Sequence, residues 1–175
     1  SEAPTVLYSR AAEATADLVP GAEAASILVR QGDLFYYEAA VGWDLEELQT
    51  HAGPFTYDEQ LKWYAGDELA FRDGAARVLK GAAITRHSMA SERSPEVLGG
   101  GRLAQMKSQV MVPIADGEGQ IVAVLNLDNF STEDAFSQNS VRLAESFAQH
   151  IAVLVRQAEQ VMELERSAVT DQLTG

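Results

Sequence analysis

Apolar and polar residues alternate with different periods along this chain, and each period predicts a different element. In residues 5–18 apolar residues recur every three or four positions, which predicts a helix that Pro20 and Gly21 end. The runs "ASILVRQ" and "LFYYEAAVG" are rich in strand-forming residues, and Gly32-Asp33 joins them. These two runs therefore predict a β-hairpin.

The middle of the chain has a less regular pattern. The segment "DLEELQ" after Trp43 predicts a short helix, and "DELAFRDGAARVLKG" predicts a helix that Gly81 closes. The next four residues, "AAIT", predict a brief strand. Residues 86–103 contain "SMASERSP" and "LGGG", which predict a long loop.

A second hairpin and a long helix complete the pattern. The strands "SQVMVPI" and "QIVAVLNLD" flank the turn "ADGEG", and Ser137 is a suitable N-cap for a helix from about Gln138 to beyond Arg166. The chain lacks the strand–helix alternation of a parallel sheet. The predicted fold class is therefore α+β, an antiparallel sheet with the terminal helices packed on one face and a long C-terminal stalk helix.

Alternation divides the strand "IVAVLNLD" into two faces. The apolar face has Ile121, Ala123, Leu125 and Leu127, and the other face has Val122, Val124, Asn126 and Asp128. We expect the apolar face to lie against the terminal helices. Asn126 and Asp128 would then present polar groups to a ligand beneath the middle loop. The alternative is that both side chains fix the loop after the strand.

The last helix carries a heptad seam. Its apolar members follow one another at alternating steps of four and three: Phe147, Ile151, Leu154, Ala158 and Val161. The seam continues to Ala168 with Glu165 as its one charged member. Two such helices would bury the stripe between them, which predicts a parallel homodimer. A stripe of the first helix could pack beside this seam: Leu7, Ala11, Ala14 and Leu18. The alternative is a helical tail that packs within its own chain.

The charge composition argues against two classes of binding partner. The formal charge is −13, from 13 basic and 26 acidic residues, and such a surface repels phosphate backbones and anionic membranes. We therefore expect neither nucleic acid nor a membrane as a partner. No apolar run approaches the roughly 18 residues that cross a bilayer, and the N-terminus does not resemble a secretory signal. The absence of cysteine fits a cytoplasmic protein.

The motifs of common enzymes do not appear. No P-loop or activated-serine motif occurs, and "GGGRLA" follows a loop-like segment, so it predicts a loop rather than a dinucleotide site. His51, His87 and His150 lie far apart in sequence and lack metal-ligand spacing, so no metal site is expected. A lone histidine can ligate haem, and His87 would be the candidate, but haem is not favoured.

Aromatic residues cluster in sequence near the middle of the chain and suggest a pocket. Tyr36 and Tyr37 must point to opposite sheet faces, so at most one of them can line it. The candidate lining residues are Tyr36, Trp63, Tyr64, Phe71, His87, Met111, Asn126 and Asp128.

The end of the chain, "TDQLTG", resembles the start of a GGDEF-type diguanylate cyclase domain, which typically begins D-x-L-T-G. Asp171, Leu173, Thr174 and Gly175 carry the match. The resemblance implies a C-terminal GGDEF domain in cis that joins two GTP molecules into cyclic di-GMP. None of the residues that match belongs to the cyclase active site.

Residues 5–166 resemble a GAF domain, including the stalk helix, and residues 167–175 would be a linker and the first GGDEF residues. The resemblance lies in "GAARVLKGAAIT", in "SQVMVPIADGEGQIVAVLNLDN" and in Asp134 with Phe136 before the final helix. It implies a sensor and dimerisation module that takes an unidentified small molecule, or a purely structural dimerisation domain. Phe130 and Asp134 match part of the cyclic-nucleotide motif N-K-x(n)-F-x(3)-D-E, but Ala135 replaces its Glu. Phytochrome-type GAF domains attach bilin through a cysteine, and this chain has none, so bilin is not expected. The resemblance names no other cofactor, and the cofactor is therefore unknown.

Overall fold

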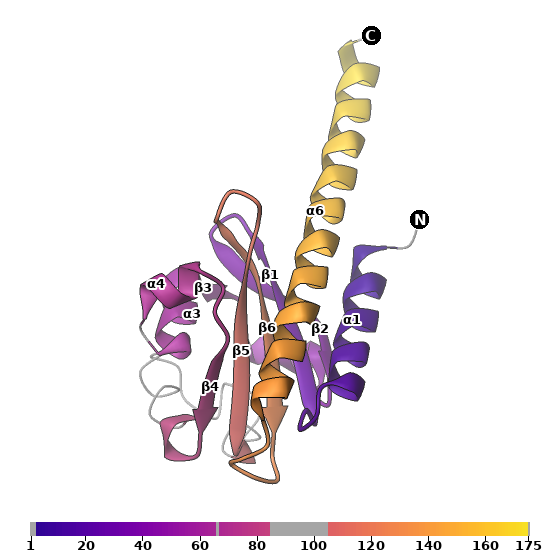
Figure 1. The fold of residues 1–175 in the computed structure, drawn as a ribbon. Coiled ribbons are helices and arrows are strands. Elements are labelled where there is room, and N and C mark those ends of the chain that lie inside the picture. Colours follow the sequence, from indigo (N-terminus) through magenta and orange to yellow (C-terminus); the bar gives the residue numbers. More distant parts are fainter. Residues whose placement is uncertain (1–2, 66, 85–104, 175) are drawn as a thin grey trace.

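A six-stranded antiparallel sheet with strand order β3-β2-β1-β6-β5-β4 runs through the protein. The computed structural model describes residues 3–65, 67–84 and 105–174 (Figure 1). The strands are β1 (Ala24–Gln31), β2 (Leu34–Val41), β3 (Phe55–Thr56), β4 (Arg77–Lys80), β5 (Ser108–Ala115) and β6 (Ile121–Asn129). Both predicted hairpins and the α+β class are confirmed.

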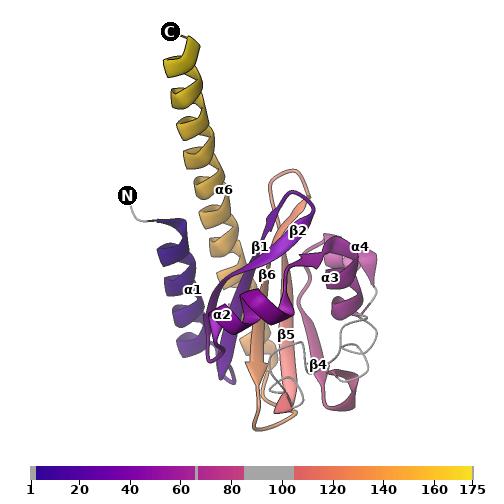
Figure 2. The same cartoon turned by 180° about the vertical axis from the view of Figure 1, so that it is seen from behind.

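Helices cover both faces of this sheet. The terminal helices α1 (Pro4–Leu18) and α6 (Gln138–Thr174) pack on one face. The opposite face carries α2 (Leu45–Glu47), the π-helical segment η1 (Leu48–Ala52), α3 (Tyr57–Tyr64) and α4 (Glu68–Arg72) (Figure 2). The predicted packing of the terminal helices on one face is therefore confirmed.

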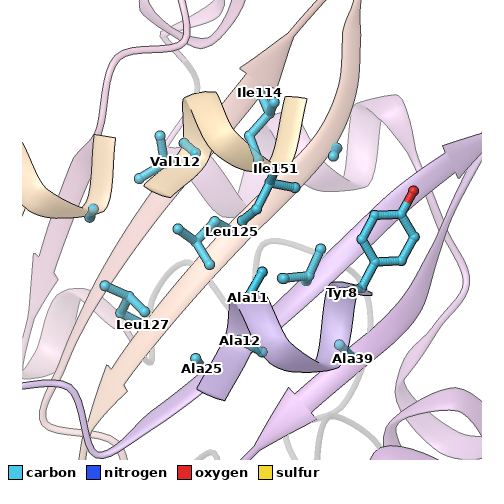
Figure 3. Close-up of a cluster of buried hydrophobic side chains, with 14 of the residues drawn as sticks. Tyr8, Ala11, Ala12, Ala25, Ala39, Val112, Ile114, Leu125, Leu127 and Ile151 are labelled. Atoms are coloured by element: carbon cyan, nitrogen blue, oxygen red, sulfur yellow. The ribbon is translucent and has the colours of Figure 1, made fainter. Parts of the chain in front are cut away.

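The core under the terminal helices is built from small residues on α1 and branched residues on the strands. Figure 3 shows Ala11 and Ala12 of α1 beside Leu125 and Leu127 of β6, with Ile151 of α6 over the same strand. Alanines let the helix approach the sheet closely, and the branched side chains fill the space between the layers. This arrangement confirms that Leu125 and Leu127 face the terminal helices.

The prediction for the start of β6 is wrong at two positions. Ile121 packs in the core on the α3 side, and Val122 packs on the α6 side, the reverse of the expectation. A bulge causes the reversal, because Ala115 pairs with Ile121 whereas Ile114 pairs with Ala123, so one residue of β6 is skipped. The alternation from Ala123 onward is as predicted.

The middle segments also differ from expectation. The predicted single helix over residues 67–81 is wrong, because α4 ends at Arg72 and β4 begins at Arg77. Gly74 lies between them with φ of +71°, a left-handed conformation that interrupts the helix. Residues 82–84 are helical, so the predicted strand there is wrong too. The predicted loop over residues 86–103 lies outside the described residues.

The long helix α6 changes environment along its length. It begins after Ser137, whose hydroxyl accepts a hydrogen bond from the Ser140 amide at 3.2 Å, as the N-cap prediction expects. Its buried residues all lie in the first half: Ser140, Ala144, Ala148, Ile151, Leu154 and Val155. Every described residue from Val161 to Thr174 is exposed, and this part extends beyond the sheet (Figure 1). None of the helices in the described ranges is long and apolar enough to span a membrane.

Candidate functional site

A pocket lies between the sheet and the helices of its second face, on the side away from α1 and α6. The empty space in it, counted together with its open mouth, is about 610 Å³. Four aromatic side chains line it: Tyr37, Trp43, Phe55 and Trp63. Its polar lining includes Ser26, Glu59, Gln60, Gln109, Asn126 and Asp128. An aromatic wall with several polar groups is typical of a ligand site.

A hydrogen-bond network forms the polar wall of this pocket. Asp128 on β6 is buried, and its carboxylate accepts hydrogen bonds from Trp43 Nε1 at 2.8 Å and from Gln109 Nε2 at 2.9 Å. The Gln109 carbonyl accepts in turn from Trp63 Nε1 at 2.8 Å and from Arg77 Nη1 at 3.1 Å. The network therefore holds both indole rings at the pocket in fixed orientations.

Arg77 supports the network from behind the pocket. Its guanidinium also donates to the backbone carbonyls of Tyr64 at 3.2 Å and Trp63 at 2.9 Å. Burial lowers the pKa of Arg77 to about 9, and the negative charge of Asp128 opposes this shift. Arg77 is therefore still a cation at neutral pH and balances the buried carboxylate.

Two buried acceptors of the pocket lack partners. Gln60 is 4% exposed and Asn126 is 6% exposed, and both line the pocket. Neither Gln60 Oε1 nor Asn126 Oδ1 has a hydrogen-bond partner among the residues that the structure describes. Because a buried polar atom without a partner costs about 1–3 kcal/mol, most proteins avoid such atoms outside functional sites. These two atoms are the strongest sign of a ligand.

The short helix α3 brings Gln60 and Trp63 to the pocket. A capping box starts this helix, since Thr56 Oγ1 accepts from the Glu59 amide and Glu59 Oε1 accepts from the Thr56 amide, both at 3.1 Å. Trp63 follows Gln60 by three positions, so both lie on one face of the helix. The sequence T-x-x-E at positions 56–59 is a signal from which the helix could have been predicted.

The structure places the predicted pocket residues in three groups. Trp63, Asn126 and Asp128 line the pocket. Tyr64, Phe71 and Met111 are buried in the hydrophobic core beneath it, so they support the site without lining it. Tyr36 is 37% exposed and does not line it, because the neighbouring Tyr37 occupies the pocket face. His87 lies outside the described residues.

The loop after β6 is fixed by Asn129, and not by Asn126 and Asp128 as the alternative prediction has it. Asn129 Oδ1 accepts from the amides of Ser131 and Thr132, each at 2.8 Å, and its Nδ2 donates to the Gly21 carbonyl at 2.8 Å. Asn129 therefore fixes the loop after β6 to the turn after α1. Asp128 is bonded within the pocket wall.

The predicted seam residues are also divided between two environments. Ala11, Ile151 and Leu154 are buried in the core of their own chain, so a second copy cannot reach their side chains. Leu7, Ala14 and Ala158 are half-buried, and Leu18 is 63% exposed. Val161 is 43% exposed and lies beyond the sheet. Any seam with a second copy would therefore begin near Ala158.

The sequence does not predict several residues of the site, and four of them carry its polar contacts: Trp43, Gln60, Arg77 and Gln109. They come from four separate segments, and only the sheet pairing and α3 bring them together. Within the described ranges, no group of three or more His, Asp or Glu side chains could hold a metal ion.

Comparisons with known proteins agree with this fold. A family model described as "GAF domain" matches residues 1–156. The chain belongs to the GAF domain family, whose members are regulatory sensor modules of signalling proteins. No curated protein sequence matches the chain.

Solved structures share the fold at low sequence identity. The GAF domain of a phosphoenolpyruvate-protein phosphotransferase from Coxiella burnetii matches with a TM-score of 0.70 and 15% identity, over 93% of this chain and 88% of that chain. Residues 122 to 287 of a methyl-accepting chemotaxis protein match with a TM-score of 0.66 and 19% identity, over 92% and 93%. A type II free methionine-R-sulfoxide reductase from Thermoplasma acidophilum matches with a TM-score of 0.62 and 17% identity, over 88% and 92%. At these identities the likeness establishes the fold alone.

Proposed function

We propose that this GAF domain senses a small molecule in its pocket and controls a diguanylate cyclase domain attached after Gly175. The distal half of α6 would join two copies as a parallel stalk and transmit the signal. The protein would act in the cytoplasm, where GTP is available. The observation that carries the proposal is the position of β6 between the pocket and α6.

Strand β6 connects the pocket to helix α6, because its side chains alternate between the two. Asn126 and Asp128 face the pocket, whereas Leu125 and Leu127 pack in the core with Ile151 of α6. A ligand that moves this strand would therefore also move the base of α6, because packed cores transmit displacement. The signal must bind two arrangements of the domain unequally to bias one of them.

The unpaired acceptors favour a sensor over a purely structural dimerisation domain. A domain that only dimerises gains nothing from leaving Gln60 Oε1 and Asn126 Oδ1 buried without partners. A ligand that donates hydrogen bonds to them would remove this cost. Ligand binding is therefore the better account of the pocket.

The distal part of α6 supports the proposal of a stalk. Large apolar residues are exposed there, namely Val161, Met162, Leu164, Val169 and Leu173. Val161 and Ala168 lie on the heptad seam, and Glu165 between them would weaken the packing and bring two registers closer in energy. Of the five exposed residues only Val161 lies on the seam, and a second copy of the same helix in parallel orientation would cover it together with Ala168.

The resemblance of "TDQLTG" to the start of a GGDEF domain supports the cyclase as the controlled partner. It implies that each cyclase domain holds one GTP, so that synthesis needs two domains face to face. A parallel stalk would set the relative rotation of these domains. Helical continuity through Thr174 would carry a rotation of α6 to the start of the cyclase domain.

Insertions after Arg156 in the full-length parent protein test this proposal. Two extra residues rotate everything beyond them by about 200°, whereas seven extra residues restore the heptad phase. We expect the two-residue insertion to reduce cyclic di-GMP synthesis at least about tenfold. The seven-residue insertion, which is longer, should retain most of the activity.

Equal activity of both insertion variants would show that the phase of the stalk does not control the cyclase. The parent gene gives a simpler check. If no cyclase sequence follows Gly175, the proposed partner is wrong.

A further inference from the structure

We propose that the ligand of this pocket is a small organic amine, bound in its protonated form and attached to a compact apolar or aromatic body. This inference rests on the proposed sensor function and names the class of molecule sensed. Three independent features of the pocket support it: its unpaired acceptors, the sign of its charges and its aromatic lining.

The unpaired acceptors require hydrogen-bond donors from the ligand. Gln60 Oε1 on α3 and Asn126 Oδ1 on β6 are carbonyl oxygens, which accept and cannot donate. They come from opposite walls, since α3 lies over the face of the sheet to which Asn126 belongs. A protonated primary amine has three N–H donors, so one group could serve both oxygens.

Among the described residues, two charged side chains line the pocket, and both are acidic. Glu59 and Asp128 are the two ionisable side chains of the lining. The nearby cation, Arg77, is not part of the lining, and its guanidinium donates to Gln109, Trp63 and Tyr64. A carboxylate or phosphate on the ligand would therefore meet like charges, whereas a cation would meet opposite ones.

The aromatic lining suits both ends of such a molecule. Trp43, Trp63, Tyr37 and Phe55 give an apolar surface for the body of the ligand. The faces of Trp and Tyr rings also attract cations, and sites for organic ammonium groups are commonly built from such rings. The network of Asp128 and Gln109 holds the two indoles in position before the ligand arrives.

Matched sets of probes separate charge from shape. Tryptamine, tryptophol and indole-3-acetate share one body and carry an ammonium, a hydroxyl and a carboxylate, and phenethylamine, 2-phenylethanol and phenylacetate form a second set. Calorimetric titration of the purified chain gives the affinity for each. In at least one set we expect the amine to bind about tenfold tighter than the alcohol and about a hundredfold tighter than the carboxylate.

Two variants test the acceptors directly. Gln60→Leu and Asn126→Leu replace the unpaired oxygens by apolar groups, and each should weaken binding of the amine about tenfold. Their melting temperatures without ligand should be equal to or above that of the unmodified chain, because a buried unpaired atom is gone. Gln120→Leu makes the same type of change in the exposed turn between β5 and β6, and it should change neither property.

The possible outcomes distinguish this inference from the sensor function. A carboxylate that binds as tightly as its amine, or amines that fail to bind at all, would overturn the amine class. Stabilisation by some other metabolite in a broad thermal-shift panel would then still support a sensor. Failure of the whole panel to raise the melting temperature would overturn the sensor function itself.

Discussion

Replacing Val161 with Asp should convert a dimer of this chain into monomers. Val161 is 43% exposed, lies beyond the sheet and belongs to the predicted seam, so the change should leave the fold of each chain intact. Two copies would lose two buried valines from their interface and place two carboxylates there instead. The loss of apolar burial alone is about 3 kcal/mol, or roughly a hundredfold in the dimer dissociation constant. Sedimentation velocity at micromolar concentration measures the change.

Val153→Asp is the matched control for this experiment. Val153 lies on the same helix and is 41% exposed, but it sits off the heptad seam. This variant should remain dimeric. Substitution of Leu154 would be a poor test, because Leu154 is buried in the core of its own chain and its loss would report on folding. A dimer that persists in the Val161 variant, or dissociates equally in the Val153 variant, would contradict the stalk.

Replacing Asp128 with Leu should lower the free energy of unfolding by about 2–6 kcal/mol. The change removes the acceptor of the buried Gln109 Nε2 and of the half-buried Trp43 Nε1, and each loss costs up to about 3 kcal/mol. It also removes the negative charge that favours the buried Arg77 cation. Since single domains are stable by about 5–15 kcal/mol, urea unfolding should detect the loss easily.

Asn126→Leu gives the matched comparison for this effect. Asn126 faces the same pocket two residues earlier on β6, but its carbonyl oxygen has no partner to lose. Its replacement should leave the stability unchanged or increase it. The opposite signs follow from the hydrogen bonds alone, because both side chains are almost fully buried. Equal destabilisation by both variants would show that the network does not distinguish them.

The framework of the fold could be predicted from the sequence because its signals are local. The strand-forming runs and the turn of each hairpin lie within one continuous segment, and so does the periodic pattern of α6. The break between α4 and β4 was missed because Gly74 lies within a helix-like composition, and pairing of β4 with β5 overrides that local preference. The bulge at Ala115 similarly depends on pairing with β6 rather than on either strand alone.

The pocket was only partly predictable for a related reason. Asn126 and Asp128 could be found because polar residues on an otherwise apolar strand stand out. Gln109 lies beside Ser108 at the start of another strand, and its role depends on the indoles of Trp43 and Trp63, which come from distant segments. Tyr36 and Tyr37 could be assigned to opposite faces, but the sequence does not say which of those faces carries the pocket.

Cross-linking through a single introduced cysteine tests the parallel stalk most directly. The chain contains no cysteine, so Val161→Cys introduces a unique thiol. In a parallel dimer this residue meets its own copy across the seam, and mild oxidation should link most chains into dimers on a non-reducing gel. Glu163→Cys turns the thiol about 200° around the exposed helix and should remain largely unlinked. Absence of the Val161→Cys cross-link, or equal cross-linking at both positions, would contradict the parallel stalk on which this account of signalling depends.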